Sequence, residues 1–200
     1  MKTFASLCVA ASLAAIATSA TARPFTPNDL VSLSRVSSPA LSADGRWLVW
    51  EQRETDLAAN KGRFDLWRLD LSRGGATPQK LAADPEANEQ APAFGRDGNV
   101  YFLSDKGGDS AELWRVPIAG GAPEQVTRDS HGLSGFRLAP SGVRLLVWAD
   151  RPVGARDLTQ VKPEAKAADG SGRTADQLFV LPLAEGKVAG PSVAIGGALI

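Results

Sequence analysis

The side chains capable of chemistry are few and scattered in this 200-residue sequence. Its one histidine lies in the string Asp129-Ser130-His131, which has the residue types of a serine-nucleophile triad. A triad needs the aspartate to orient the histidine and the histidine to reach the serine, and three consecutive residues cannot aim their side chains that way. We therefore interpret the string as a polar loop, and these residues offer no other histidine from which a triad could be built.

Metal ligands are equally sparse. One histidine and one cysteine, Cys8, cannot supply a zinc site of the His/Cys type. The segment from Asp105 to Glu112 lacks the Asp-x-Asp-x-Asp-Gly spacing of a calcium loop, so a hairpin loop is expected. Asp84, Glu86 and Glu89 form an acidic stretch that is expected to be a solvated loop between two repeats. The sequence therefore predicts no catalytic, cofactor-binding or metal-binding residue, and no cofactor.

Composition narrows the class of protein. The 22 basic and 22 acidic residues cancel, which leaves no basic footprint for nucleic acid or anionic lipid. With 44% hydrophobic and 22% charged residues the chain has a globular composition. The 13 prolines and 20 glycines indicate many turns and disfavour long helical bundles. No nucleic-acid partner is expected.

The amino terminus has the pattern of an export signal. Lys2 supplies a positive charge, Phe4–Ile16 is uncharged and mostly apolar, and Ala20-Thr21-Ala22 is a small-x-small cleavage pattern. The apolar run is too short to span a bilayer core of about 30 Å. Residues 1–22 are thus a predicted signal peptide, cleaved after Ala22. The mature protein should be periplasmic or secreted, soluble, free of cysteine and without a membrane partner.

Two units recur three times in the mature chain, in the same order. The first is a strand, a tight turn and a second strand, for which Asp-Gly favours a type I′ hairpin turn. The second is a run of alternating apolar and polar residues, typical of a half-buried strand. The first unit spans Pro39–Trp50, Pro92–Leu103 and Phe136–Trp148, and the second spans Asp65–Leu71, Glu112–Ile118 and Gln177–Leu183.

The spacing of the units predicts the fold class. Two hairpins per period give four strands in about 45 residues, which is the period of a β-propeller blade. We predict an all-β chain: an incomplete propeller of four-stranded blades over residues 39–200, with three legible blades at about 39–91, 92–135 and 136–200. A two-sheet sandwich of similar hairpins is the alternative. The polar stretch 149–176 is either a functional connection or a surface insertion.

Aromatic residues recur at fixed positions of the repeats, as expected for packing between blades. The predicted equivalents are Trp67 with Trp114 and Phe179, and Trp50 with Leu103 and Trp148. Trp47 stands outside this scheme but is also expected in the core.

A short helix should precede the first blade, within an N-terminal segment of residues 23–38. Thr26 can cap it, Pro27 suits its first position, and Asp29 completes a capping-box spacing. The helix should run from Pro27 to about Ser34 and place Leu30 and Leu33 against the propeller.

The opening run Phe25–Trp47 resembles the start of exported bacterial serine peptidases of the prolyl oligopeptidase (S9) family, in the dipeptidyl-peptidase and acylaminoacyl-peptidase branches. In those proteins a Thr-Pro-x-Asp-Leu helix and a Ser-Pro-Asp-Gly turn introduce a propeller. Here Ala43 replaces the proline of the turn. The resemblance covers Phe25 to about Leu183. It implies a propeller over a C-terminal α/β-hydrolase domain that uses Ser, His and Asp.

For this chain the resemblance implies substrate gating, in which the propeller limits access to short peptides. Peptide substrates are then the expected partners, through a hydrolase domain that these residues do not include. The string nearest to a G-x-S-x-G elbow, Gly132-Leu133-Ser134-Gly135, lacks the final spacing. The parent family is a hydrolase family, but the chain itself is expected to carry no catalytic triad.

Two alternatives remain open at this stage. A non-catalytic, periplasmic TolB-like propeller that binds a protein partner fits the repeats equally well. A truncated gene product is the other. Because 178 mature residues allow about four blades and only three are legible, we expect these residues to be the front part of a longer protein.

Overall fold

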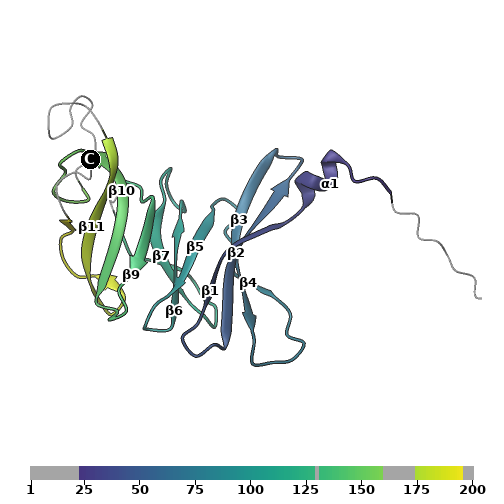
Figure 1. The fold of residues 1–200 in the computed structure, drawn as a ribbon, viewed down its shortest axis with the longest axis horizontal. Helices are drawn as coiled ribbons and strands as arrows, with labels where there is room; N and C mark the ends of the chain where they lie inside the picture. Colours follow the sequence, from purple (N-terminus) through teal and green to yellow (C-terminus); the bar gives the residue numbers. More distant parts are fainter. Residues whose placement is uncertain (1–22, 129–130, 160–173, 196–200) are drawn as a thin grey trace, which may run out of the picture.

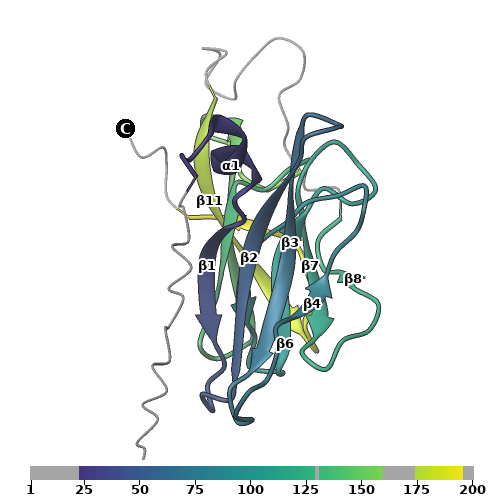
Figure 2. The ribbon, with the colours of Figure 1, turned by 90° about the vertical axis from the view of Figure 1, so that its right-hand side faces the viewer.

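The computed structural model describes residues 23–128, 131–159 and 174–195, so the predicted signal peptide and its cleavage site lie outside the described residues. In these ranges one short helix precedes three antiparallel sheets, which stand side by side in chain order (Figures 1 and 2). The chain is thus nearly all β, and its four-stranded sheets are blades of the predicted kind. Within these ranges no helix is long and apolar enough to cross a bilayer.

The first two sheets are simple four-stranded meanders, each in the order of the chain. The first contains β1 (Arg35–Leu41), β2 (Trp47–Asp56), β3 (Lys61–Asp70) and β4 (Gln79–Ala82). The second contains β5 (Glu89–Phe94), β6 (Asn99–Ser104), β7 (Glu112–Pro117) and β8 (Glu124–Gln125).

The third sheet repeats this order and adds a strand. It contains β9 (Gly135–Leu138), β10 (Arg144–Pro152), β11 (Thr174–Ala184) and β12 (Lys187–Val188), while β13 (Val193–Ala194) pairs with β11. Strands β10 and β11 extend into the polar stretch 149–176, where Ala149 pairs with Gln177 and Pro152 with Thr174. That stretch is therefore strand at both ends, and residues 160–173 lie outside the described residues.

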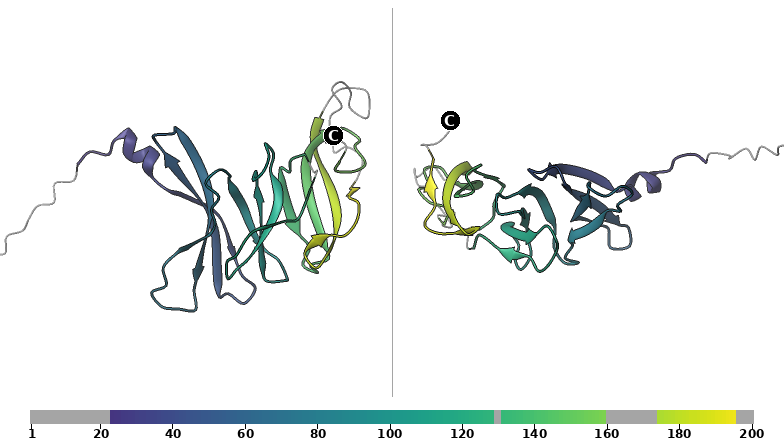
Figure 3. Two further views of the ribbon diagram at one scale, coloured as in Figure 1. Left: turned by 180° about the vertical axis from the view of Figure 1, so that it is seen from behind. Right: turned by 90° about the horizontal axis from the view of Figure 1, so that it is seen from below.

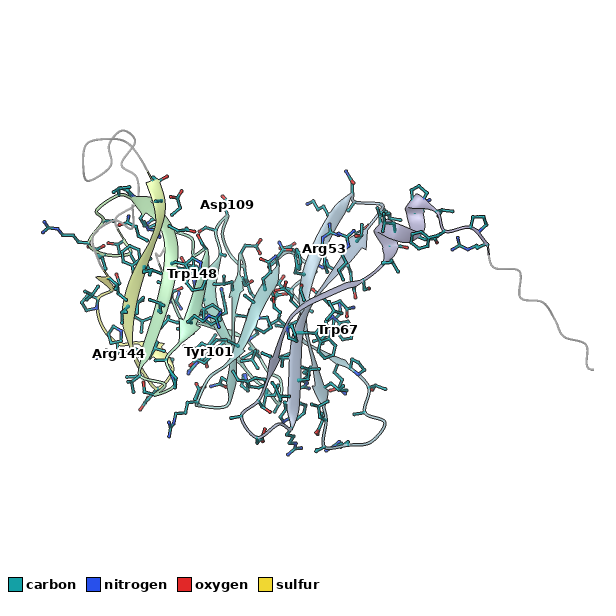
Figure 4. The ribbon with its side chains drawn as sticks, in the orientation of Figure 1. Arg53, Trp67, Tyr101, Asp109, Arg144 and Trp148 are labelled. Carbon is teal, nitrogen blue, oxygen red and sulfur yellow. The ribbon has the colours of Figure 1, made fainter. Side chains whose placement is uncertain are left out.

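Because neighbouring strands are antiparallel, the connections alternate between two ends of the sheets. We call one end the helix face; it carries α1 (Pro27–Ser32) and the connections 83–88 and 105–111. The opposite end is the turn face, formed by the connections 42–46, 71–78, 95–98, 118–123 and 139–143. Figure 4 labels one residue near each end, Asp109 at the helix face and Arg144 at the turn face.

The hairpins at Asp44-Gly45, Asp97-Gly98 and Ser141-Gly142 form as predicted, but the turn type is different. The amide of Gly45 donates to the carbonyl of Ser42, and the same bond joins Gly98 to Gly95 and Gly142 to Ala139. Only the glycines have positive φ, near 70–78°, whereas a type I′ turn needs positive φ at both central residues. These are therefore type I-like turns closed by a left-handed glycine.

The three sheets face one another in sequence (Figure 3), and the buried apolar residues of the described ranges form two clusters, one between each pair of neighbouring sheets. Between the first and second sheets lie seven buried apolar residues: Val49, Leu66, Leu81, Ala82, Val100, Phe102 and Val116. Between the second and third lie fourteen, with Leu113, Leu145, Val147 and Phe179 fully buried among them. Each blade therefore gains its stability largely from the face of its neighbour.

The strand register corrects one predicted set of equivalent aromatic residues. Trp67, Trp114 and Phe179 are equivalent, since they lie opposite Trp50, Phe102 and Val147 respectively. The counterparts of Trp50 are thus Phe102 and Val147, not Leu103 and Trp148. A shift of one residue moves a side chain to the other face of a sheet, so the difference decides which neighbour each residue packs against.

Helix α1 has the predicted amino-terminal cap, but Leu30 and Leu33 are exposed and not packed against the sheets. The Thr26 hydroxyl accepts from the Asp29 amide at 3.3 Å, and Asp29 Oδ2 accepts from the Thr26 amide at 2.8 Å. The helix ends at Ser32, and Leu30 and Leu33 are 53% and 52% exposed. The prediction that they pack on the propeller is therefore wrong for the described residues.

Candidate functional site

The β4–β5 connection on the helix face buries a carboxyl group that the sequence suggested was solvated. Glu89 opens β5 and is 2% exposed, so that prediction is wrong for Glu89, although Glu86 is exposed. Glu89 Oε1 accepts the Asp84 amide at 3.2 Å, while the buried Oε2 has no hydrogen-bond partner in the described structure. The turn itself is closed by Asp84, whose Oδ1 accepts the Glu86 amide at 3.0 Å.

The two acidic stretches singled out in the sequence meet in space at this point. Asp105, on the β6–β7 hairpin, accepts from the backbone amide of Asn88 at 2.6 Å and from its side-chain amide at 2.9 Å. The next residue, Lys106, places its ammonium 3.0 Å from Asp84 Oδ2. The β6–β7 hairpin of the second blade thus holds the connection that leaves the first blade.

A cavity of about 230 Å³ lies against Glu89, between the first and second blades. Its walls include Leu81, Phe102 and Trp114, and its rim includes Lys106. The indole Nε1 of Trp114 is buried without a hydrogen-bond partner in the described structure. A carboxyl oxygen and an indole N–H, each buried beside apolar walls, form an arrangement suited to binding.

Burial raises the pKa of Glu89 to about 7. The Asp84 amide works against that rise, whereas the neighbouring carboxylates of Asp65, Asp84 and Asp105 add to it. The group therefore exchanges its proton close to neutral pH. Ser104 lies directly opposite Glu89 in the ladder and is also buried, with its hydroxyl accepting the Lys106 amide at 3.2 Å. A buried carboxyl group beside a cavity is suited to binding and positioning a ligand.

Two further polar contacts involve the first blade, one within it and one that reaches the second blade, and sequence reasoning missed both. Asp65 is 2% exposed and lies 2.5 Å from the Lys80 ammonium. Glu51 bridges the blades, because Oε1 accepts the Ser37 hydroxyl at 2.6 Å and Oε2 accepts the Ala91 amide at 2.7 Å. For Asp65 a signal existed, since the three equivalent strands have Asp65, Glu112 and Gln177 two residues before the aromatic.

The remaining sequence candidates do not come together as a catalytic group. His131 is exposed with φ of 52°, and Asp129 and Ser130 lie outside the described residues. The Ser134 hydroxyl donates to Asp176 Oδ1 at 2.9 Å. Asp109 stands exposed at the tip of its hairpin (Figure 4). Within the described ranges no three His, Cys, Asp or Glu side chains are grouped as a metal site.

Trp47 is likewise placed differently from the prediction. It is half-buried on the turn face and belongs to neither core cluster. The guanidinium carbons of Arg46 and Arg68 lie 5.4 and 5.8 Å from the centre of its ring.

Comparison with known proteins defines the class as a β-propeller of the kind found in S9 peptidases. No family model matches the chain. It is 32% identical over 151 residues to dipeptidyl-peptidase 5 of Porphyromonas gingivalis, a match that covers 75% of this chain and 21% of that protein. The resemblance to the propeller region of the prolyl oligopeptidase (S9) family is therefore confirmed.

Solved structures agree on the fold. The acylaminoacyl peptidase of Pyrococcus horikoshii matches with a TM-score of 0.57 and 12% identity, over 82% of this chain and 26% of that one. TolB of Acinetobacter baumannii matches with a TM-score of 0.52 and 14% identity, over 82% and 33%. The chain spans about a fifth of the length of the curated relatives it matches.

Proposed function

We propose that this chain is the propeller part of an exported serine peptidase and that it limits which peptides reach a separate α/β-hydrolase domain. The observation that carries the proposal is the match to dipeptidyl-peptidase 5, which extends over three quarters of the chain. In this proposal the propeller positions short peptides, while the hydrolase domain supplies Ser, His and Asp for hydrolysis.

The helix face supports this role through its chemistry. Glu89, Asp84 and Asp105 gather there with a cavity between two blades, and Glu89 titrates near pH 7. Such a surface suits recognition of peptide N–H groups more than covalent catalysis. The export part of the proposal depends on residues 1–22, whose pattern predicts a signal cleaved after Ala22.

The test begins with the protein as its native host makes it. An affinity-tagged product of the locus would be purified and its intact mass and amino terminus determined. It would then be labelled with a fluorophosphonate probe and assayed on fluorogenic dipeptides and on casein. We expect an amino terminus at Arg23, a labelled serine outside the present residues, and cleavage of the dipeptides but not of casein.

Gating is tested separately by deleting the propeller from that full-length protein. We expect the deletion to admit casein, whereas unchanged size selection would remove the gating role. A native product without a reactive serine that captures a protein partner would instead favour the TolB-like alternative, a non-catalytic binding propeller. TolB structures are among the fold neighbours of this chain.

A further inference from the structure

Two hollows open on the turn face, and Trp47 lines both. The larger measures about 730 Å³ and is mostly apolar, with walls from all three blades: Leu41, Trp47, Phe94, Ile118, Leu138 and Pro140. This volume lies within the range of pockets that hold small-molecule or short-peptide ligands. Leu41 is 57% exposed there, so the hollow offers apolar surface to solvent.

The smaller hollow, about 310 Å³, lies on the other side of Trp47 and is basic. Arg46, Arg68 and Arg73 line it, and its single carboxylate is Asp70. Asp70 pairs with Arg46 at 3.2 Å and with Arg73 at 3.3 Å. Asp70 therefore pairs with two of the three guanidinium groups, and the carboxylate of Asp44 adds a further attraction to Arg46.

The charge of this hollow is fixed at any physiological pH. The hydrogen bonds from Arg46 and then from Ser72 lower the pKa of Asp70 to about 2. Arg68 contacts neutral groups only, the Ile118 carbonyl and Gln79 Oε1, and its buried Nε has no hydrogen-bond partner in the described structure. An incoming anion therefore meets three guanidinium groups that the carboxylates of Asp70 and Asp44 leave partly unneutralised.

Trp47 explains why this combination occurs in one blade only. The register makes Asn99 and Arg144 its counterparts in the second and third blades. Neither supplies an aromatic ring that could hold two guanidinium groups on one side and close an apolar hollow on the other. Within the described residues, the apolar hollow and the basic hollow therefore meet at Trp47.

We propose that the turn face binds a short peptide that ends in an apolar residue with a free α-carboxylate. The carboxylate pairs with the guanidinium groups of Arg46, Arg68 and Arg73, and the apolar side chains lie in the larger hollow. Arg96, on the rim of that hollow, adds a donor for a peptide carbonyl. The proposal goes beyond gating by a hydrolase domain and does not depend on it, because both hollows are built from the blades described above.

The test compares two ligands on the unmodified full chain by titration calorimetry: N-acetyl-Ala-Ala-Phe as the free acid and as the C-terminal amide. We expect the acid to bind at least about tenfold more tightly than the amide. Equal binding of the two would overturn the proposal. Because this comparison needs no substitution, failure of a variant to fold cannot obscure it.

Variants then locate the site. Arg73 is 75% exposed in its side chain, so Arg73→Gln should leave the fold intact and weaken binding of the acid about tenfold. Leu41→Ser should weaken the acid and the amide alike. Arg144→Gln is the matched control, an exposed arginine on the same face but in the third blade (Figure 4). An equal loss with this control would contradict the assignment.

Two further probes test the class of ligand. Inorganic phosphate alone should bind weakly, because it cannot occupy the apolar hollow. Decanoate should bind more weakly than the peptide, because it has no peptide carbonyl to accept from Arg96. Phosphate binding as tight as that of the peptide would reduce the site to a general anion site and overturn the proposal. Tighter binding of decanoate would do the same in favour of a fatty-acid site.

Discussion

The two junctions between blades are built from the same repeat but held by different interactions. Between the second and third blades the core is large and apolar, with Leu113, Leu145, Val147 and Phe179 among fourteen buried residues. Between the first and second it has seven, and the buried carboxyl group of Glu89 lies beside them.

One position shows how the difference arises. Glu51 and Leu103 occupy equivalent places, opposite Leu66 and Leu113, and each faces the following blade. Leu103 joins the apolar core, whereas Glu51 bonds across the junction to the Ala91 amide. The first junction therefore includes a buried carboxyl group and a charged bridge, whereas the core of the second is apolar. The repeats therefore share their strand pairing, whereas the contacts between neighbouring blades differ from one junction to the next.

The largest effect is expected where packing dominates. Phe179 is fully buried in the second junction, so Phe179→Ala should lower the free energy of unfolding by about 4 kcal/mol through lost burial and a residual cavity. Urea denaturation measures the loss. Hydrogen exchange should show the third sheet deprotected first, while β2 and β3 stay protected. Val193→Ala, at a 63% exposed position of the same sheet, is the control. Uniform deprotection of all three sheets would mean that the junctions are not separable.

A smaller loss is expected at the rim of the same junction. Gly186, at φ of 73° in the β11–β12 turn, lies so close to Arg115, Tyr101 and Asp97 that a Cβ would overlap all three. Gly186→Ala should therefore cost about 3 kcal/mol through backbone strain and overpacking.

The same substitution has a spectroscopic signature. Burial, and then the hydrogen bond to Asp97, raise the pKa of Tyr101 to about 12, and Tyr101 is the one tyrosine of the chain. Its ultraviolet titration should move toward about 10 if the substitution breaks the hydrogen bond between Tyr101 and Asp97. Gly108→Ala, where a Cβ meets nothing, should change neither quantity. An unaltered tyrosine titration in Gly186→Ala would contradict the close packing of Gly186 against Tyr101 and Asp97.

The sequence predicts the sheets better than it predicts what lies between them. The Asp-Gly turns and the Trp67, Trp114 and Phe179 positions follow from local periodicity, and the structure has both. The burial of Glu89 does not follow, because it depends on the β6–β7 hairpin of the next blade closing over the connection. A local pattern cannot report contacts made by residues that are distant in the chain.

The same reason accounts for α1 and Trp47. The capping box is encoded within four residues and was predicted correctly. Tertiary packing decides whether Leu30 and Leu33 are covered by other residues. Both are exposed in the described structure. Trp47 was expected in the core, whereas Arg46, in the β1–β2 connection, and Arg68, in β3, lie beside its ring at the edge of two hollows.

The first junction should respond to pH in a way the second does not. The folded-state pKa of Glu89, about 7, exceeds its ordinary value of 4.5. The stability linked to its proton is then fully present below about pH 4.5 and lost as the pH rises through 7. Glu89→Gln mimics the neutral form and should be more stable than the parent by about 2 kcal/mol at pH 8, with little difference at pH 4.

Thermal and urea unfolding at both pH values measure this effect. Glu86→Gln, three residues earlier and exposed, is the matched control and should leave the pH dependence unchanged. A Glu89→Gln variant that is less stable than the parent at pH 8 would show that the ionised carboxylate is an attractive partner in the junction. In that case the ionised carboxylate of Glu89 would stabilise the first junction, which is the opposite of the effect expected here.

The smallest effect is expected at the ion pair on the rim of the first junction. Lys106 and Asp84 are 3.0 Å apart, with side chains 43% and 24% exposed, so water screens most of their attraction. Lys106→Ala should lower the free energy of unfolding by about 0.5 kcal/mol at low salt and by less at high salt. Lys61→Ala, at an exposed position on the same face, is the control for loss of a positive charge. A loss above about 2 kcal/mol that salt does not reduce would mean that Lys106 compensates the buried carboxyl of Glu89 directly, because only a desolvated interaction escapes screening.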